Sequence, residues 1–162
     1  VDLYLLPEIE FAPPERLLTY DTLMQAGQGL SEQVRQRQEP LTVLGTVLQV
    51  RPPRYYRVET VLKIGVAFDD GRRDQIVRLV EAACHRFFSP YPEDPTISPF
   101  GRTLYRADLE SLLRRIEGLN YAEVIGLTRR DEQSEAVAER VVNVELPPNA
   151  LAYLGRCSVE FV

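Results

Sequence analysis

The chain is poor in the residues that most often carry reaction chemistry. Of its 162 residues one is a histidine and two are cysteines, and Lys63 is the single lysine among 19 basic residues. One lysine leaves little scope for Schiff-base chemistry. The nine glycines are scattered and form neither a G-x-G-x-x-G nor a Walker pattern, so the usual sequence signal for nucleotide binding is missing.

Long apolar runs and a surplus of positive charge are missing as well. No apolar run approaches the roughly 20 residues that cross a bilayer, and no basic-then-apolar leader is visible, so we expect neither a membrane span nor secretion. Twenty-four acidic residues against 19 basic ones give a net charge of −5, which disfavours nucleic-acid binding. The chain begins inside an apolar alternation, which indicates a piece of a longer protein.

The few reactive side chains have simple structural interpretations. His85 has only Glu81 at helical spacing, which is typical of a helix-surface histidine. Asp69 and Asp70 stand before a glycine between a strand and a helix, where acidic residues favour a turn and a helix start. A hydrolase that used Asp69 or Asp70 would need a partner that the sequence does not place. We therefore expect no catalytic, cofactor-binding or metal-binding residues.

The two cysteines lie far apart in the sequence. Cys84 and Cys157 are 73 positions apart, and each occupies an apolar pattern. Two cysteines in a chain of this size form no disulfide scaffold and do not match metal-ligand spacing. We expect both to be buried, reduced thiols.

Hydrophobic periodicity predicts a first lobe with βαβ order. Residues 1–6 alternate like a strand, and residues 7–20 indicate a proline-rich surface loop. A capping-box pattern that begins at Thr22 predicts a helix over residues 22–38. The nearly continuous apolar run of residues 41–50 predicts a strand covered on both faces.

The double proline Pro52–Pro53 breaks this pattern and predicts two domains, residues 1–52 and 53–162. In the second domain we expect strands over residues 56–68, 120–127, 140–146 and 157–161, a charged loop over 128–139, and helices over 72–88 and about 109–116, with Gly118 as a cap. On the first helix the apolar face is Ile76, Leu79, Val80, Ala83 and Phe87. The order, βαβ then βααβββ, predicts an α+β fold of mixed sheets covered on one face by amphipathic helices.

Two motifs are candidates for structural or interface roles. The first is Tyr55 and Tyr56, beside the double proline. This pair fits either a partner-facing aromatic surface or a half-buried strand end.

The second candidate motif consists of Pro99, Phe100, Gly101, Arg102 and, three residues on, Tyr105. We expect Gly101 to adopt a backbone conformation closed to other residues and Phe100 to pack under the loop. Arg102 either bridges loop carbonyls and an acid such as Asp108 or faces a neighbouring subunit.

Several stretches carry a resemblance to a known family. In chain order they are Val50 to Tyr55 (VRPPRY), Phe88 to Pro90 (FSP), Pro99 to Arg106 (PFGRTLYR), Leu109 and Leu112, Ile116 to Val124, and Val144 to Leu151. Their order and spacing resemble the C-terminal part of baseplate J-like proteins, wedge components of contractile phage tails and of related tail-like injection particles. The likeness covers residues 40–162 and, more loosely, 1–39, while residues 7–20 have no equivalent in the pattern.

The resemblance implies a non-enzymatic structural protein, built into a ring of wedges around a spike hub through contacts with other wedge and hub proteins and with copies of itself. It also implies assembly in the cytoplasm, a later place in a virion or tail-like particle, and that this chain is a C-terminal portion. The alternative function is a small-molecule-binding regulatory module of ferredoxin-like type. A concave apolar pocket with converging polar groups would favour the alternative.

Overall fold

The computed structural model describes residues 2–6, 19–38, 49–67, 71–94 and 96–162. The chain divides into two compact units, residues 1–54 and 55–162, two residues after the boundary expected at the double proline. Of the helices in the described ranges, none is long and apolar enough to span a membrane.

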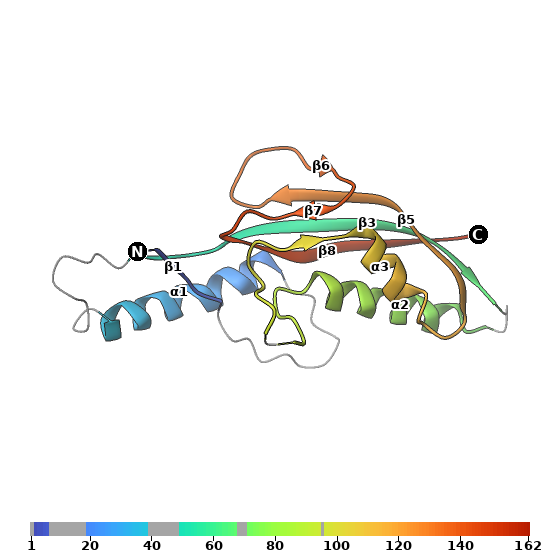
Figure 1. The fold of residues 1–162 in the computed structure, drawn as a ribbon, viewed down its shortest axis with the longest axis horizontal. Helices are drawn as coiled ribbons and strands as arrows, with labels where there is room; N and C mark the ends of the chain where they lie inside the picture. The colour runs from blue at the N-terminus through green and yellow to red at the C-terminus, as the bar shows by residue number, and fades with distance from the viewer. Residues whose placement is uncertain (1, 7–18, 39–48, 68–70, 95) are drawn as a thin grey trace. The chain divides into compact units, whose positions relative to one another are not determined.

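The smaller unit has the expected βαβ order. Strand β1 (Asp2–Tyr4) pairs in parallel with β2 (Gln49–Arg51), and helix α1 (Tyr20–Gln38) contacts β2 (Figure 1). The helix begins two residues before its predicted start. Thr19, not Thr22, is the capping residue, because its hydroxyl accepts the Thr22 N–H at 3.3 Å and its carbonyl accepts the first helical hydrogen bond. The predicted loop 7–20 and strand 41–50 lie almost wholly outside the described residues.

The larger unit is built on a four-stranded sheet in the order β6-β5-β3-β8. Strands β3 (Arg54–Val66) and β5 (Leu119–Asp131) pair antiparallel over almost their whole length. Figure 1 shows β8 (Ala150–Phe161) running in the same direction as β3, so the sheet is mixed. A short strand, β6 (Glu139–Arg140), pairs with the end of β5.

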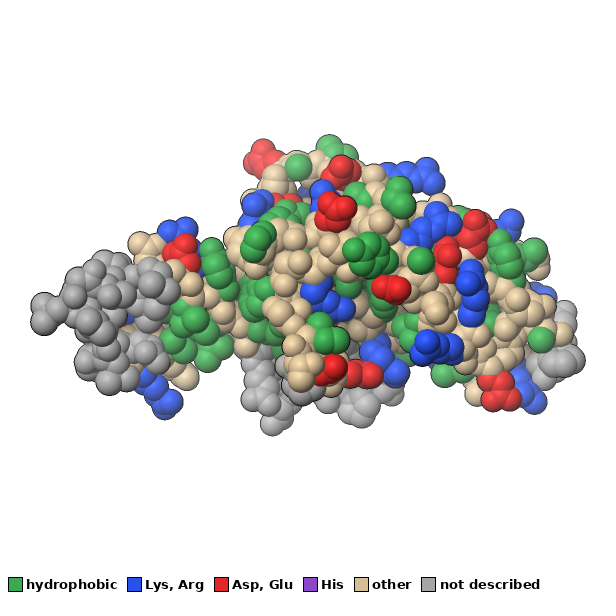
Figure 2. Space-filling view, in the orientation of Figure 1, with side chains coloured by type: hydrophobic (Ala, Val, Ile, Leu, Met, Phe, Trp, Pro, Cys, Tyr) green, Lys and Arg blue, Asp and Glu red, His purple; other side chains and the backbone are tan. Residues whose placement is uncertain are grey.

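Two helices cover one face of this sheet. Helix α2 (Arg73–Phe88) packs mainly on β8, helix α3 (Arg106–Leu113) packs on β5, and the two helices contact each other. One core cluster joins both helices to β3, β5 and β8. The prediction of an α+β fold with mixed sheets and helices on one face is therefore confirmed. Figure 2 shows basic and acidic side chains interspersed on the visible face of this unit, so neither sign dominates there.

The buried face of α2 differs from the predicted one. Full burial falls on every fourth residue, namely Ile76, Val80, Cys84 and Phe88. Leu79 is 46% exposed, so its predicted burial was wrong, while Ala83 and Phe87 are half-buried beside the core. The reason is that α2 packs mainly on the outermost strand, which covers only a narrow stripe of the helix.

The predicted return strand over residues 140–146 was also wrong. Two separate two-residue strands replace it: β6 pairs with β5, and β7 (Val144–Glu145) pairs with β4 (Thr103–Leu104). Strand β5 continues four residues past its predicted end, so Thr128–Asp131 is strand and not loop. The backbone has to leave β5 after β6 in order to reach β4, and one strand cannot make both pairings.

Helix α3 begins three residues before its predicted start and ends three before its predicted end. Ile116 lies in a tight turn beyond the helix, where its N–H donates to the Leu113 carbonyl at 3.0 Å. Gly118 has φ +93°, as its expected left-handed role requires, but it turns the chain into β5 and does not cap α3 directly.

Candidate interaction site around Arg102 and the edge of β5

Two sequence motifs that lie more than forty residues apart meet in one corner. Gly101 has φ +64°, and a Cβ at this position would stand 3.1 Å from the Pro148 Cα. The Gly101 N–H donates to the Ala150 carbonyl at 3.3 Å, and the Leu146 N–H donates to the Arg102 carbonyl at 3.1 Å. The prediction for Gly101 is confirmed. We call residues 99–102 with 146–148 the proline corner.

Arg102 is the charged side chain of the proline corner. It is half-buried, and this burial lowers the pKa of its guanidinium. Within the part of the chain that the structure describes, the guanidinium has neither a hydrogen bond nor an ion pair with another residue. The predicted bridge to Asp108 is wrong, because Asp108 lies on the exposed side of α3. Pro99 and Phe100 are half-buried in the same loop.

An exposed aromatic and an exposed aliphatic side chain flank the start of α3. Tyr105 is 51% exposed and Val142 is 72% exposed. Tyr105 provides no side-chain cap for α3; the Asn143 side chain does so instead, since its Oδ1 accepts the Arg106 N–H at 3.0 Å. This bond fixes the segment that carries Val142 beside the first turn of α3.

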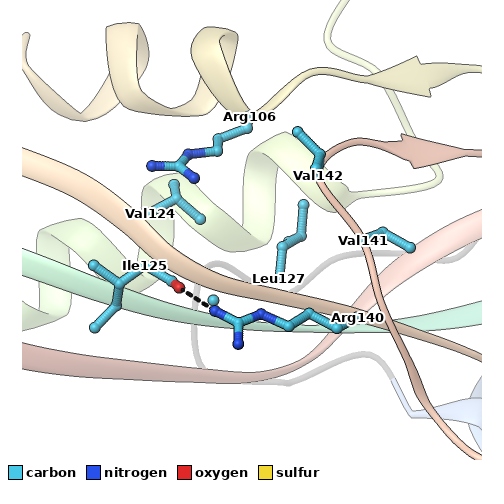
Figure 3. Close-up of a pocket in the computed structure, with 8 residues that line it drawn as sticks. Arg106, Val124, Ile125, Leu127, Arg140, Val141 and Val142 are labelled. Atoms are coloured by element: carbon cyan, nitrogen blue, oxygen red, sulfur yellow. Dashed lines mark hydrogen bonds between the residues drawn. The ribbon is translucent and has the colours of Figure 1, made fainter.

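A pocket of about 370 Å³ opens next to this segment, at the outer edge of β5 (Figure 3). Arg106 reaches it from α3 and Arg140 from β6, on opposite sides of an apolar floor. Arg140 donates from Nη2 to the Ile125 carbonyl at 3.1 Å. The lining is Arg106, Val124, Ile125, Gly126, Leu127, Arg140, Val141 and Val142.

Glu110 binds the backbone of β5 and the side chain of Arg106 next to this pocket. Its Oε1 accepts the Val124 N–H at 3.0 Å and the Arg106 Nε–H at 2.9 Å, and its side chain is 15% exposed. Burial raises the pKa of Glu110, but these two hydrogen bonds and the charges of Arg106 and Arg114 outweigh it, so the pKa lies below its usual value. Glu110 is therefore ionised at neutral pH and neutralises Arg106.

The side chains that line the pocket are suited to binding. The lining consists of guanidinium groups, aliphatic side chains and strand backbone. Guanidinium groups recognise carboxylates and phosphates, and the aliphatic floor recognises apolar groups. The arrangement can hold an acidic, partly apolar segment of another molecule.

The structure does not bring the tyrosine pair to this surface. Tyr55 is 1% exposed, so the partner-facing interpretation is wrong for it. Tyr56 is half-buried against the core, and the Arg129 guanidinium lies 5.8 Å from the centre of its ring. Tyr55 and Tyr56 are the second and third residues of β3.

The other reactive candidates from the sequence stay outside the site. His85 lies on α2, where burial lowers its pKa and the charge of Glu81 partly opposes this effect. Among the described residues there is no group of three or more potential metal ligands. Asp69 and Asp70 lie outside the described residues.

Sequence reasoning missed Glu110, Arg140 and Asn143. Each acts on a backbone group 14 to 37 positions away, at Val124, Ile125 and Arg106 respectively. No spacing rule marks such a contact, because the partner is a peptide group and not a recognisable side chain.

The comparisons with known proteins add no relative. No protein-family model matches the chain, and no curated protein matches it.

Proposed function

We propose that the chain is a structural wedge component of the baseplate of a contractile phage tail or phage-tail-like particle, acting through protein–protein contacts. The resemblance to baseplate J-like proteins motivates the proposal. Two of the stretches that carry it, Pro99 to Arg106 and Val144 to Leu151, form the proline corner together. Two stretches that contact each other in the fold can form that contact only if their order and spacing along the chain allow it.

The observation that carries the proposal is the state of Arg102. The Arg102 guanidinium is partly desolvated, and among the described residues it has no hydrogen bond or opposite charge that offsets this cost. None of its nitrogens is among the buried atoms without a partner, so the group remains open to a new acceptor. An acidic group on a neighbouring protein would supply that compensation. Tyr105 and Val142 add exposed aromatic and aliphatic surface nearby, and arginine and aromatic residues carry much of the energy of protein interfaces.

Arg102→Gln in the full-length protein tests this role. We expect the free energy of unfolding to change by no more than about 0.5 kcal/mol, because the described part of the chain gives Arg102 no internal partner to lose. We expect fewer assembled particles in negative-stain images of preparations from the producing cells. Arg115→Gln is the matched control, since Arg115 is exposed in the turn after α3 and should leave particle yield unchanged.

Two outcomes would contradict the proposal. If Arg102→Gln lowers stability by 1–3 kcal/mol, the residue has an internal partner of about the usual hydrogen-bond value. If both stability and particle yield stay normal, Arg102 is not an interface residue. Purified full-length protein without any co-purifying tail particles would count against the wedge assignment as a whole.

The pocket beside Arg140 supports a second candidate, a module that binds a small anionic ligand. Its volume of about 370 Å³ lies in the range of ligand sites. Along the chain, α2 and α3 both come after β3 and before β5. This order differs from the β-α-β-β-α-β order of ferredoxin-like folds. A rise in the melting temperature with one carboxylate or phosphate compound, lost in Arg140→Gln, would favour this candidate.

A further inference from the structure

The two cysteines, remote in sequence, lie on two elements that pack together, α2 and β8. The two elements run in opposite directions (Figure 1), and the Arg73 guanidinium at the start of α2 lies 5.2 Å from the centre of the Phe161 ring at the end of β8. At about 1.5 Å per helical residue and about 3.3 Å per strand residue, Cys84 and Cys157 lie at about the same level along the two elements. Cys84 belongs to the buried stripe of α2 and has no exposed surface. Cys157 lies on β8, is only half-buried, and packs against the same core cluster. The prediction of two buried thiols therefore holds for Cys84 and is corrected for Cys157, and the structure has both as free thiols.

The two thiols differ in how readily each can react. A hydrogen bond with Cys157 is the largest cause of a raised pKa at Cys84, followed by burial and by the negative charges of Cys157 and Glu81. Cys84 therefore stays protonated and shielded. Cys157 is the cysteine that a dissolved oxidant reaches first, because it is only partly buried whereas Cys84 has no exposed surface.

We propose that Cys84 and Cys157 are a latent cross-link, which a peroxide converts into a disulfide bond between α2 and β8. The Cys157 sulfur attacks one peroxide oxygen, the O–O bond breaks, and the products are a sulfenic acid and one water molecule. The Cys84 sulfur then attacks the Cys157 sulfur, loses its proton, and displaces the hydroxyl group as a second water molecule. Two thiols lose two electrons and two protons, and hydrogen peroxide is reduced to two water molecules.

The bond would fasten the outermost strand of the sheet to the helix that covers it. It closes a loop across most of the larger unit, and cross-links over long loops restrict the unfolded chain most strongly. If the wedge assignment is correct, the protein assembles in a reducing cytoplasm and meets oxidants after release, so the cross-link would form in the finished particle. This timing rests on the proposed function, whereas the reaction itself does not.

The test uses the whole chain, purified under reducing conditions and then treated with hydrogen peroxide. We expect a mass loss of two hydrogens and, in a non-reducing digest, a peptide pair that joins Cys84 to Cys157. We expect the melting temperature to rise by on the order of 5–15 °C and to return after treatment with dithiothreitol.

Cys157→Ser is the control, because the half-buried position tolerates a hydroxyl group better than the core position does. It should fold, gain no cross-link and show no rise in melting temperature with peroxide. Cys84→Ala serves as the second variant, with Cys157 then expected to stop at the sulfenic acid. Oxidation of Cys157 in the native chain without a Cys84 link, or a link only between two chains, would overturn the inference. Neither result would bear on the wedge assignment, because that assignment is tested separately by the particle yield of Arg102→Gln.

Discussion

The two ends of the helical layer in the larger unit are held by different kinds of contact. Where α2 meets β8, a stripe of apolar side chains is excluded from water. Where α3 meets β5, charged and amide side chains hold backbone groups: Glu110 holds the Val124 N–H, and Asn143 holds the Arg106 N–H. Side-chain periodicity indicates which face of the helix makes the first kind of contact, and the strand that covers the helix decides how wide the buried stripe is. The second depends on which peptide groups the sheet and the start of α3 leave unpaired, so it emerges only after the fold has formed.

Phe88→Ala should have the largest effect, because it removes a large apolar side chain from the α2 stripe. Phe88 is 1% exposed, and a truncation of this kind costs about 3–5 kcal/mol. Denaturant unfolding measures the loss. Leu79→Ala on the same helix is the control and should stay within about 1 kcal/mol, because Leu79 is half exposed. Equal losses of unfolding free energy in the two variants would contradict the assignment of Phe88 to the buried face of α2 and of Leu79 to its exposed side.

Glu110→Ala tests the polar contacts between α3 and β5. It leaves the Val124 N–H without an acceptor and should lower the free energy of unfolding by about 1–3 kcal/mol. Glu117→Ala, at an exposed position in the turn after α3, is the control and should change little. Hydrogen exchange adds a local readout, since the Val124 amide should lose protection only in Glu110→Ala. Unchanged protection there would show that Glu110 does not hold the edge.

Gly101→Ala tests the proline corner that lies beside the polar end. A left-handed backbone costs a residue with a Cβ about 1–2 kcal/mol, and here the new atom also meets Pro148. Gly29→Ala should have the opposite sign, because Gly29 lies inside α1 with nothing within 4 Å of its Cβ position. Alanine there should stabilise the helix by roughly 0.5–1 kcal/mol. Thermal unfolding of both variants compares the signs, and a stabilised Gly101→Ala would contradict the corner geometry.

The smallest effect is the pH dependence that Glu110 contributes. Its pKa in the folded chain lies below the usual 4.5, so the unfolded state binds the proton first as pH falls. The stabilisation is therefore complete above about pH 4.5 and is lost as pH drops through the folded pKa. Melting temperatures measured from neutral pH down to about pH 3 should fall less steeply in Glu110→Gln than in the native chain. Parallel curves would show that the carboxylate is not selectively stabilised.

The sequence allowed prediction of those parts of the fold that depend on repetition along one element. The alternation of β3 located that strand within two residues, and the start and end of α2 were found within one. The same reasoning placed Leu79 in the core, because periodicity defines an apolar face but not the width of the strand that covers it. The split of residues 140–146 into β6 and β7 follows from which neighbour each half meets.

In the candidate site, the backbone conformation of single residues could be predicted, but contacts between segments far apart in the sequence could not. The left-handed Gly101 followed from a glycine after a proline-rich approach. That its backbone rests on Pro148 needed the return of a chain segment 47 positions later. That Arg102 has no partner among the described residues depends on every segment around it, so no motif could reveal it.

The bulge in β5 has a consequence for how the chain behaves at high concentration. Val61 pairs with Gly126 and Leu62 with Val124, so Ile125 is an extra residue in the strand. At this point the edge offers its N–H to a carboxylate and its C=O to a guanidinium. A foreign strand would have to displace two charged side chains and match an irregular register before it could add to the sheet. These features therefore disfavour aggregation by pairing of another chain with this stretch of the β5 edge.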